Sequence, residues 1–172
     1  MKADIIVVGG GAAGLMAAWG AADALVAKGS DASVVVLEKM PRPARKVMIT
    51  GKGRCNFTNL KDWNEFSAHI RTNPNFAKPS FFNLTPQRLI DLFEGYGMPT
   101  VVERGDRAFP ESHRASDVVD TLVSACHSKG VKIETEAAVK TVEQTDEGFR
   151  LDMENGGVWT CRKLIIATGG LS

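Results

Sequence analysis

Apolar residues at the start of the chain follow two different spacings, and each spacing predicts a different element. Residues 5–8 and Val34–Leu37 are continuous apolar runs, which are typical of strands buried on both faces of a parallel sheet. Between them, apolar side chains recur every three or four positions and so predict a helix with one face on the sheet, closed by Gly29. That face consists of Leu15, Ala18, Trp19, Ala22, Leu25 and Val26. Residues 4–38 therefore predict a strand–helix–strand unit.

The middle of the chain predicts shorter elements. Residues 39–61 are expected to form an extended loop with glycine turns, and residues 62–96 to be helical in pieces. One of these helices has Thr85 as its N-cap and Pro86 as its first residue. Strands are expected on either side of a glycine–aspartate turn, at Thr100–Glu103 and Arg107–Pro110. A further helix, capped by Ser116 and ended by Gly130, follows.

From residue 131 onward the pattern predicts only strands. Four of them are expected at residues 131–134, 137–143, 149–153 and 158–161, which form a β-meander inserted before a last apolar strand at residues 163–168. That last strand runs into two glycines, a pattern typical of a central parallel strand whose carboxyl end touches a ligand. The expected fold is α/β, a Rossmann-like domain with a parallel sheet and an inserted β-meander, and residues 1–172 are expected to be one domain.

A glycine-rich turn joins the first strand to the first helix. Gly9 suits a tight turn, Gly11 suits close approach of a pyrophosphate to the backbone, and Gly14 suits close packing of helix on strand. The helix start, including Ala12 and Ala13, then offers amide groups to phosphates. Glu38 ends the second strand 24 residues after Gly14, where it can accept hydrogen bonds from an adenosine ribose and repel a 2′-phosphate. This arrangement favours FAD or NAD over NADP.

The segment after Glu38 carries the most uneven charge in the chain. Seven cations precede the next acid, Asp62, namely Lys39, Arg42, Arg45, Lys46, Lys52, Arg54 and Lys61. Backbone amides near Gly51 and Gly53 beside these cations could form a concave anion site for a pyrophosphate or an acidic substrate. A solvated basic loop is the alternative that the sequence leaves open.

Composition narrows the class of protein. A net charge of +1 gives no general attraction to nucleic acid or to an anionic membrane. Three cysteines without a CxxC pair argue against a disulfide framework and a zinc ribbon, and they favour a cytoplasmic setting. No stretch reaches the roughly 20 apolar residues of a membrane helix. The histidines are scattered, so no metal site is expected, and the pair Asp117 and Asp120 is expected to complement a helix dipole rather than to catalyse. Catalytic residues stay unknown.

Four stretches together resemble one known family. They are the glycine turn with Glu38 and Lys39, residues 45–59 (RKVMITGKGRCNFTN), residues 107–118 (RAFPESHRASDV), and residues 166–170 (IATGG). In these motifs the chain resembles the two-dinucleotide-binding-domain flavoproteins, and within them the BaiN-like FAD-dependent bacterial proteins, some described as aminoacetone oxidases. Because members of that family are more than twice as long, we expect this chain to be an N-terminal FAD-binding part.

The resemblance implies FAD as the cofactor, with the ribose on Glu38 and the pyrophosphate at Gly11. It implies that the basic segment runs along the cofactor toward the flavin and that Val139 offers backbone to the adenine. The site residues that it adds are Lys39, Arg45, Lys46, Thr50, Gly51, Gly53, Arg54, Cys55, Asn56, Val139, Ala167, Thr168 and Gly169. Cationic neighbours could make Cys55 a reactive thiolate, although a structural cysteine is the favoured interpretation.

These features leave three functional hypotheses. The leading one is a flavoprotein oxidoreductase that transfers hydride through FAD to or from a small molecule, with NAD(P)H as a possible electron donor. The second is a nucleotide-binding module without catalysis. The third, held lowest, is an RNA-modifying flavoprotein, because the basic run contains one aromatic residue, Phe57, and single-strand binding surfaces use several stacking rings.

Overall fold

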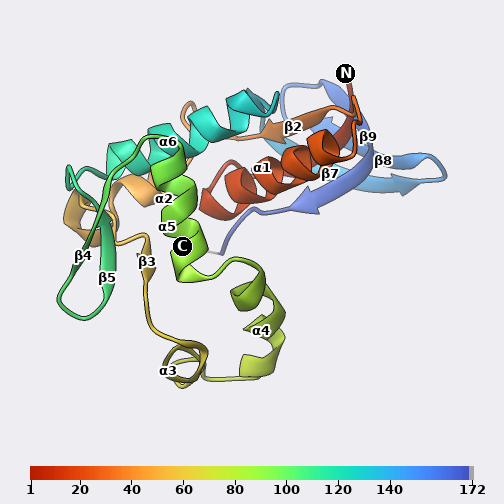
Figure 1. The fold of residues 1–172 in the computed structure, drawn as a ribbon. Helices are drawn as coiled ribbons and strands as arrows, with labels where there is room; N and C mark the ends of the chain where they lie inside the picture. Colours follow the sequence, from red (N-terminus) through yellow and green to blue (C-terminus); the bar gives the residue numbers. More distant parts are fainter. Residues whose placement is uncertain (171–172) are drawn as a thin grey trace. The chain divides into compact units, whose positions relative to one another are not determined.

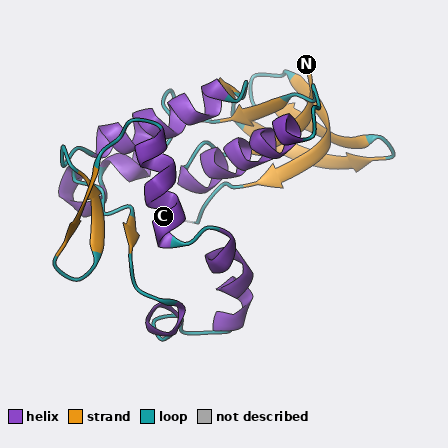
Figure 2. Cartoon of the chain, viewed as in Figure 1, coloured by secondary structure: helices purple, strands orange, loops and turns teal. Residues whose placement is uncertain are grey.

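The computed structural model describes residues 1–170, which fall into two compact units (Figure 1). The first unit comprises residues 1–47 and 122–170, and the second comprises Met48–Thr121. Each unit has its own sheet and its own helices (Figure 2).

The first unit is built on a six-stranded sheet with the order β6-β2-β1-β9-β8-β7. Strands β1 (Lys2–Val8), β2 (Val34–Leu37), β6 (Lys132–Glu134) and β9 (Val158–Ile166) pair in parallel. Strands β8 (Gly148–Met153) and β7 (Val139–Thr145) extend the sheet by antiparallel hairpin pairing. The sequence expectation of an α/β, Rossmann-like fold with a meander is confirmed.

Helix α1 (Ala12–Ala27) follows β1 and packs on the sheet through Leu15, Ala18 and Ala22, which are all buried. Val26 was expected on this face, but 59% of its surface is exposed, so the buried face stops one turn earlier. Alternate residues of β1 and β2 form a buried cluster with residues of β8 and β9, and its members include Ile6, Val35, Leu37, Leu151 and Trp159. The residues between them, such as Val7 and Val36, are also fully buried. The central strands are thus covered on both faces, as their continuous apolar sequences predicted.

Two expectations for the last third of the chain were wrong. Residues 158–161 and 163–168 are not separate strands, because β9 runs unbroken through Val158–Ile166. Its two neighbours overlap along it: Val158 to Cys161 pair with β8 on one side, and Thr160 to Ile166 pair with β1 on the other. Residues 131–134 are not part of the meander either, because β6 pairs in parallel with β2 at the opposite edge of the sheet.

The second unit contains a three-stranded antiparallel sheet with the order β3-β5-β4. Its strands are β3 (Thr58–Asn59), β4 (Thr100–Glu103) and β5 (Arg107–Pro110), and the hairpin of β4 with β5 is the one that the sequence predicted. Its helices are α3 (Trp63–Ser67), α4 (Pro74–Asn83) and α5 (Pro86–Gly95). Thr85 caps α5 as expected, since its hydroxyl oxygen accepts a hydrogen bond from the Arg88 amide at 3.3 Å.

The basic segment is less extended than its sequence suggested. It contains helix α2 (Arg45–Met48) and a kinked turn, η1 (Thr50–Gly53), in which Gly51 and Lys52 have left-handed backbone angles, before β3 begins. Backbone angles explain the compaction, because Ala44, Lys52 and Cys55 all adopt positive φ and turn the chain sharply. Helix α6 (Ala115–Ser128) also begins earlier than expected. Ser116 lies inside its first turn and donates to the Asp117 carboxylate at 3.0 Å, so it is not the N-cap.

Candidate functional site

The carboxyl ends of β2, β1 and β9 meet at one edge of the first unit. The Gly9 amide donates to the Leu37 carbonyl at 2.8 Å, and the Ala167 amide donates to the Val8 carbonyl at 2.8 Å. The chain leaves β1 through α1 toward β2, whereas β9 lies on the other side of β1. This is a topological switch point, where ligands of open α/β sheets bind.

Glycines at this edge are required by close contacts. A Cβ on Gly9, whose φ is +105°, would lie 2.5 Å from the Ala167 carbonyl oxygen. A Cβ on Gly14 would lie 1.8 Å from the Gly9 carbonyl oxygen. A Cβ on Gly11 would meet nothing within 4 Å, so this residue faces open space rather than the protein. Gly9 and Gly14 thus shape the turn, while Gly11 leaves room for a ligand.

The start of α1 is free of competing side chains. Gly11 is the N-cap, no side chain caps the helix, and the first turn carries no acid. Ala12 and Ala13 are exposed, and the α-helical ladder begins where the Leu15 amide donates to the Gly11 carbonyl at 2.9 Å. First-turn amides have no carbonyl partner in the helix ladder and lie at the positive end of its dipole. An anion could therefore bind here.

Glu38 lies beside the glycine turn and is buried, with 8% of its surface exposed. One carboxylate oxygen accepts from the Gly10 amide at 2.7 Å, and the other accepts from the Met40 amide at 2.8 Å. Its backbone amide donates to the Glu134 carbonyl, and its carbonyl accepts from the Ala137 amide at 2.9 Å. Because each carboxylate oxygen has a second lone pair, Glu38 can still accept a ligand hydroxyl.

Two further segments are fastened to this edge by backbone hydrogen bonds. The Ala44 amide donates to the Gly10 carbonyl at 2.8 Å, so Arg45 and Lys46, both exposed, follow directly from the glycine turn. The Glu136 amide donates to the Met40 carbonyl at 3.2 Å, shortly before Val139 opens β7. Four expected site residues complete the set in this unit, namely Lys39, Ala167, Thr168 and Gly169, of which Ala167 is half-buried and the others are exposed.

The remaining expected site residues belong to the second unit, and their contacts there are internal. Arg54 is ion-paired with Glu103, donates to His113 Nδ1 at 2.9 Å, and places its guanidinium carbon 4.5 Å from the Phe109 ring centre. The Asn56 amide group donates to the carbonyls of Thr58 and Ala108 at 2.8 and 2.9 Å. Thr50, Gly51 and Gly53 belong to the kinked turn η1 before them, where a Cβ on Gly51 would lie 3.1 Å from the Asn56 amide.

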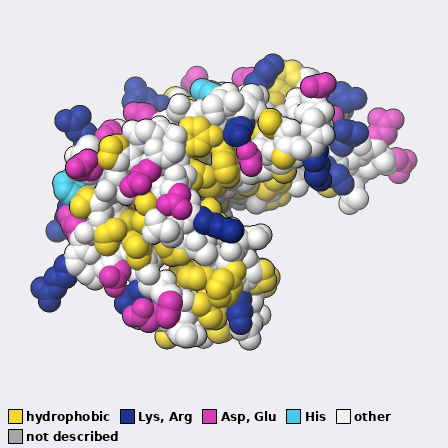
Figure 3. Space-filling model, viewed as in Figure 1, with side chains coloured by type: hydrophobic (Ala, Val, Ile, Leu, Met, Phe, Trp, Pro, Cys, Tyr) yellow, Lys and Arg dark blue, Asp and Glu magenta, His cyan; other side chains and the backbone are white. Residues whose placement is uncertain are grey.

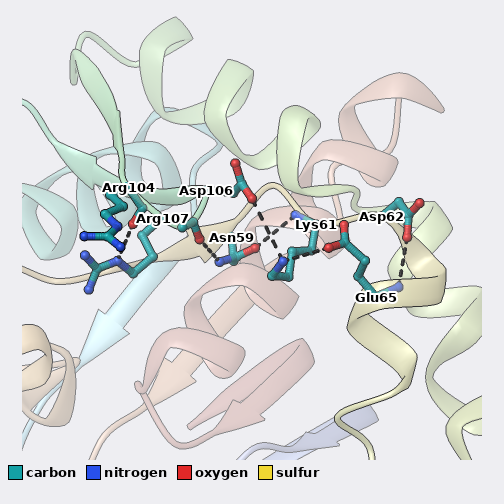
Figure 4. Close-up of polar contacts among 8 residues, drawn as sticks. Asn59, Lys61, Asp62, Glu65, Arg104, Asp106 and Arg107 are labelled. Atoms are coloured by element: carbon teal, nitrogen blue, oxygen red, sulfur yellow. Dashed lines mark hydrogen bonds and ion pairs between the residues drawn. The ribbon is translucent and has the colours of Figure 1, made fainter.

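Acidic side chains offset part of the positive charge of the basic segment. Lys61 lies 2.8 Å from the Glu65 carboxylate and 4.0 Å from that of Asp106, as Figure 4 shows. Glu103 forms an ion pair with Arg54 and offsets its charge. Neither Glu103 nor Asp106 was singled out from the sequence, because both lie on the β4–β5 hairpin, more than 40 residues away. The anion site expected around Gly51 therefore has less positive charge than the sequence suggests.

Burial overturns the hypothesis of a reactive Cys55. Only 3% of its surface is exposed, and burial raises the pKa of its thiol, with a hydrogen bond to Thr50 as a smaller opposing effect. Burial likewise raises the pKa of Cys126 to about 11, while the Cys126 thiol donates to the Leu15 carbonyl at 3.3 Å. Raised thiol pKa values disfavour thiolates, so these cysteines have structural roles.

Residues 1–170 contain no cluster of three or more His, Cys, Asp or Glu side chains that could hold a metal ion. In the same residues, no helix combines the length and apolar character that crossing a membrane requires.

Comparison with known proteins agrees with this geometry. Residues 3–172 match the HI0933-like protein Rossmann domain. The chain belongs to the HI0933-like family. This match confirms the resemblance to BaiN-like proteins that the four motifs indicated.

Curated relatives of this HI0933-like chain differ in their names. It is 35% identical to a ribosomal RNA dihydrouridine synthase of Escherichia coli over 98% of its own length and 40% of that protein. It is 36% identical to one of Haemophilus influenzae over 97% of its length and 40% of that protein. A 3-dehydro-bile acid delta(4,6)-reductase of Clostridium scindens is 30% identical over 95% of the chain and 38% of that protein. The chain thus spans about 40% of the length of these relatives.

Solved structures support the fold. Quinol fumarate reductase FrdA of E. coli superposes with a TM-score of 0.72 at 21% identity, over 99% of this chain and 33% of that one. A 3-ketosteroid-delta4-(5alpha)-dehydrogenase of Rhodococcus jostii superposes with a TM-score of 0.68 at 17% identity, over 98% and 46%. At these identities the likeness establishes the Rossmann-like fold of the HI0933-like chain and nothing finer.

Proposed function

We propose that this chain is the FAD-binding part of a flavoprotein oxidoreductase. The observation that carries the proposal is the buried Glu38 carboxylate, held by two backbone amides beside the glycine turn at the switch point of the sheet. An acid at the end of the second strand is the group that accepts hydrogen bonds from an adenosine ribose, and its charge disfavours a 2′-phosphate.

The residues fit FAD in both shape and charge. Gly11 leaves open space, and the uncapped first turn of α1 supplies amides for a pyrophosphate. Backbone hydrogen bonds join Glu136 to Met40 and Ala137 to Glu38. This segment leads to Val139, whose backbone would face the adenine. The expected residues of the basic segment and of residues 167–169 would lie along the rest of the cofactor. FAD would supply hydride transfer, and the protein would bind and orient it.

We further propose that the reaction is a reduction. The relatives are named a dihydrouridine synthase and a bile acid reductase, and both names denote the addition of hydrogen to an unsaturated substrate. NAD(P)H would be the electron donor. No side chain of this chain is assigned to the chemical step, because the relatives are more than twice as long and substrate contacts would come in large part from their additional length.

RNA is the substrate class that two relatives favour. The E. coli and H. influenzae proteins, at 35% and 36% identity, are both named ribosomal RNA dihydrouridine synthases. The sequence alone ranked an RNA substrate lowest. With these relatives, we propose RNA and a small molecule as the two candidate substrate classes. A nucleotide-binding module without catalysis is the alternative if the chain acts alone.

The decisive experiment is a visible absorption spectrum of the purified protein after reconstitution with FAD and removal of the excess. We expect a resolved flavin band, release of FAD on denaturation, and competition by ADP. The Glu38→Ala variant should lose the band, whereas Glu134→Gln, a change on the exposed side of β6, should keep it. A folded protein that takes up no FAD but binds NAD would overturn the cofactor assignment.

A further inference from the structure

An open cavity of about 400 Å³ lies entirely within the second unit. It is bordered by β3, α3, α4 and the start of α5, and its lining includes Phe57, Asn59, Phe66, Ser80, Phe81 and Leu84. Its volume falls in the roughly 300–1,000 Å³ range of sites for small organic groups. None of these residues is among the cofactor residues named above, although Phe57 and Asn59 follow Asn56 in the basic segment.

Three of the lining residues of the cavity are phenylalanines, namely Phe57, Phe66 and Phe81. The Phe66 and Phe81 rings lie 5.0 Å apart with an angle of 30° between their planes, and Trp63 supports Phe81 from 5.4 Å. Phe66 is 42% exposed although it is apolar. Figure 3 shows hydrophobic side chains gathered on one face of the part of the molecule that contains α3 and α4. An exposed planar ring such as that of Phe66 suits a planar ligand that stacks on it.

The fold brings further aromatic residues to the single one in the basic run, whose scarcity of rings argued against RNA binding. Phe57 is the one aromatic residue of the basic run, and single-strand binding requires several rings. In the structure, Phe57 shares its cavity with Phe66 and Phe81, which come from two helices further along the chain. Thr58 and Ser80 also line this cavity, and a hydroxyl group can hydrogen-bond the polar edge of a base.

Arg88 is the cation that follows the lining residues Leu84 and Pro86 in the chain. The Arg88 guanidinium donates to the Asn83 carbonyl at 3.0 Å, next to Leu84 in the lining. Within residues 1–170 no salt bridge joins Arg88 to an acid, whereas Lys61, two residues after the lining residue Asn59, is paired with Glu65 and Asp106 (Figure 4). Arg88 can therefore offer its charge to a phosphate beside a bound base.

We propose that this cavity binds an unpaired nucleobase of single-stranded RNA, with Phe66 and Phe81 as stacking surfaces and Arg88 facing the adjoining phosphate. The proposal rests on the RNA-directed form of the proposed function and names where the substrate is held. It assigns these residues to substrate binding and none of them to the chemical step.

The test is the affinity of the purified protein for a short, fluorescently labelled, uridine-rich RNA, measured by anisotropy. Phe66→Leu keeps the apolar bulk but removes the aromatic face, and it should weaken binding about 5- to 150-fold, the range measured for one stacked base. Phe76→Leu is the matched control, because Phe76 lies on α4, is 84% exposed and lies outside the cavity lining; this change should leave the affinity unaltered. Arg88→Gln should reduce the salt dependence by about one phosphate contact.

Several results would overturn the assignment. Equal effects of Phe66→Leu and Phe76→Leu would place RNA binding elsewhere, and so would normal binding by Ser80→Leu, which fills the cavity from its lining. Binding of free uridine monophosphate without binding of RNA would make it a mononucleotide site. If the parent protein bound no RNA but self-associated, and Phe66→Leu abolished that self-association, the cavity would be a protein–protein contact. The flavin band is recorded on every sample, so failure of FAD binding is seen separately.

Discussion

Replacing Glu38 by alanine removes the acceptor for two backbone amides at once. The Gly10 and Met40 amides donate to its two oxygens at 2.7 and 2.8 Å, and Glu38 is buried. A hydrogen bond to a charged acceptor contributes about 1.5–3 kcal/mol, and a buried donor left without a partner costs a comparable amount. Water entering the vacated space would restore part of this. We therefore expect Glu38→Ala to lower the free energy of unfolding by about 2–4 kcal/mol.

Glu38→Gln distinguishes hydrogen bonding from simple loss of bulk. Glutamine has the same shape, but one of its two terminal groups is an NH₂ donor. That group would face either the Gly10 or the Met40 amide, so one donor would lose its acceptor whichever way the side chain turns. We expect this variant to be destabilised by about half as much as Glu38→Ala.

Urea unfolding followed by far-UV circular dichroism, without added FAD, measures these differences. The control is Glu134→Gln, which changes an exposed carboxylate on the adjacent strand and should stay within about 0.5 kcal/mol of the parent protein. Should Glu38→Gln also stay within about 0.5 kcal/mol, the two amide bonds do not hold this edge of the sheet and the reasoning fails.

Three other predictions concern the same unit. Gly14→Ala should prevent folding or abolish FAD uptake, because its Cβ would lie 1.8 Å from the Gly9 carbonyl oxygen. The control is Gly20→Ala on the same helix, which should be tolerated because a Cβ there meets nothing within 4 Å. A soluble Gly14→Ala protein that binds FAD would contradict this prediction. Hydrogen bonds from Ser33 and the charge of Arg162 lower the pKa of Asp4, so its contribution is present above the unfolded value and is lost as pH falls through the lower folded value. Asp4→Asn should therefore cost up to about 1 kcal/mol at pH 7 and nothing at strongly acidic pH, and a urea-midpoint difference that persists in acid would refute this linkage. Iodoacetamide at pH 8 should label the native cysteines slowly, since all three thiols are buried and the pKa of Cys126 is about 11; rapid native labelling, as fast as in urea, would show that burial does not protect them.

Local patterns were sufficient for much of the fold. The apolar runs of β1 and β2, the spacing of α1, the Thr85 cap and the β4–β5 hairpin depend on residues close together in the chain, and all were predicted. The errors came where distant partners decide. β9 was divided in two because Arg162 and Lys163 interrupt its apolar pattern, yet pairing with β1 carries the strand through them. Ser116 resembled a cap, but the helix begins one residue before it.

For the candidate site, the sequence alone determined the glycine turn and the acid at the end of the second strand, because their spacing reflects one strand–helix–strand unit. Tertiary structure decided what those residues contact: Glu38 holds Gly10 and Met40, and segments near residues 44 and 137 are fastened beside it. It also showed that Glu103 offsets Arg54 and that Cys55 is buried. The cavity lined by Phe57, Phe66 and Phe81 likewise appears only in the fold, because these residues come from separate parts of the chain. Charge and burial depend on neighbours in space, which spacing along a chain does not record.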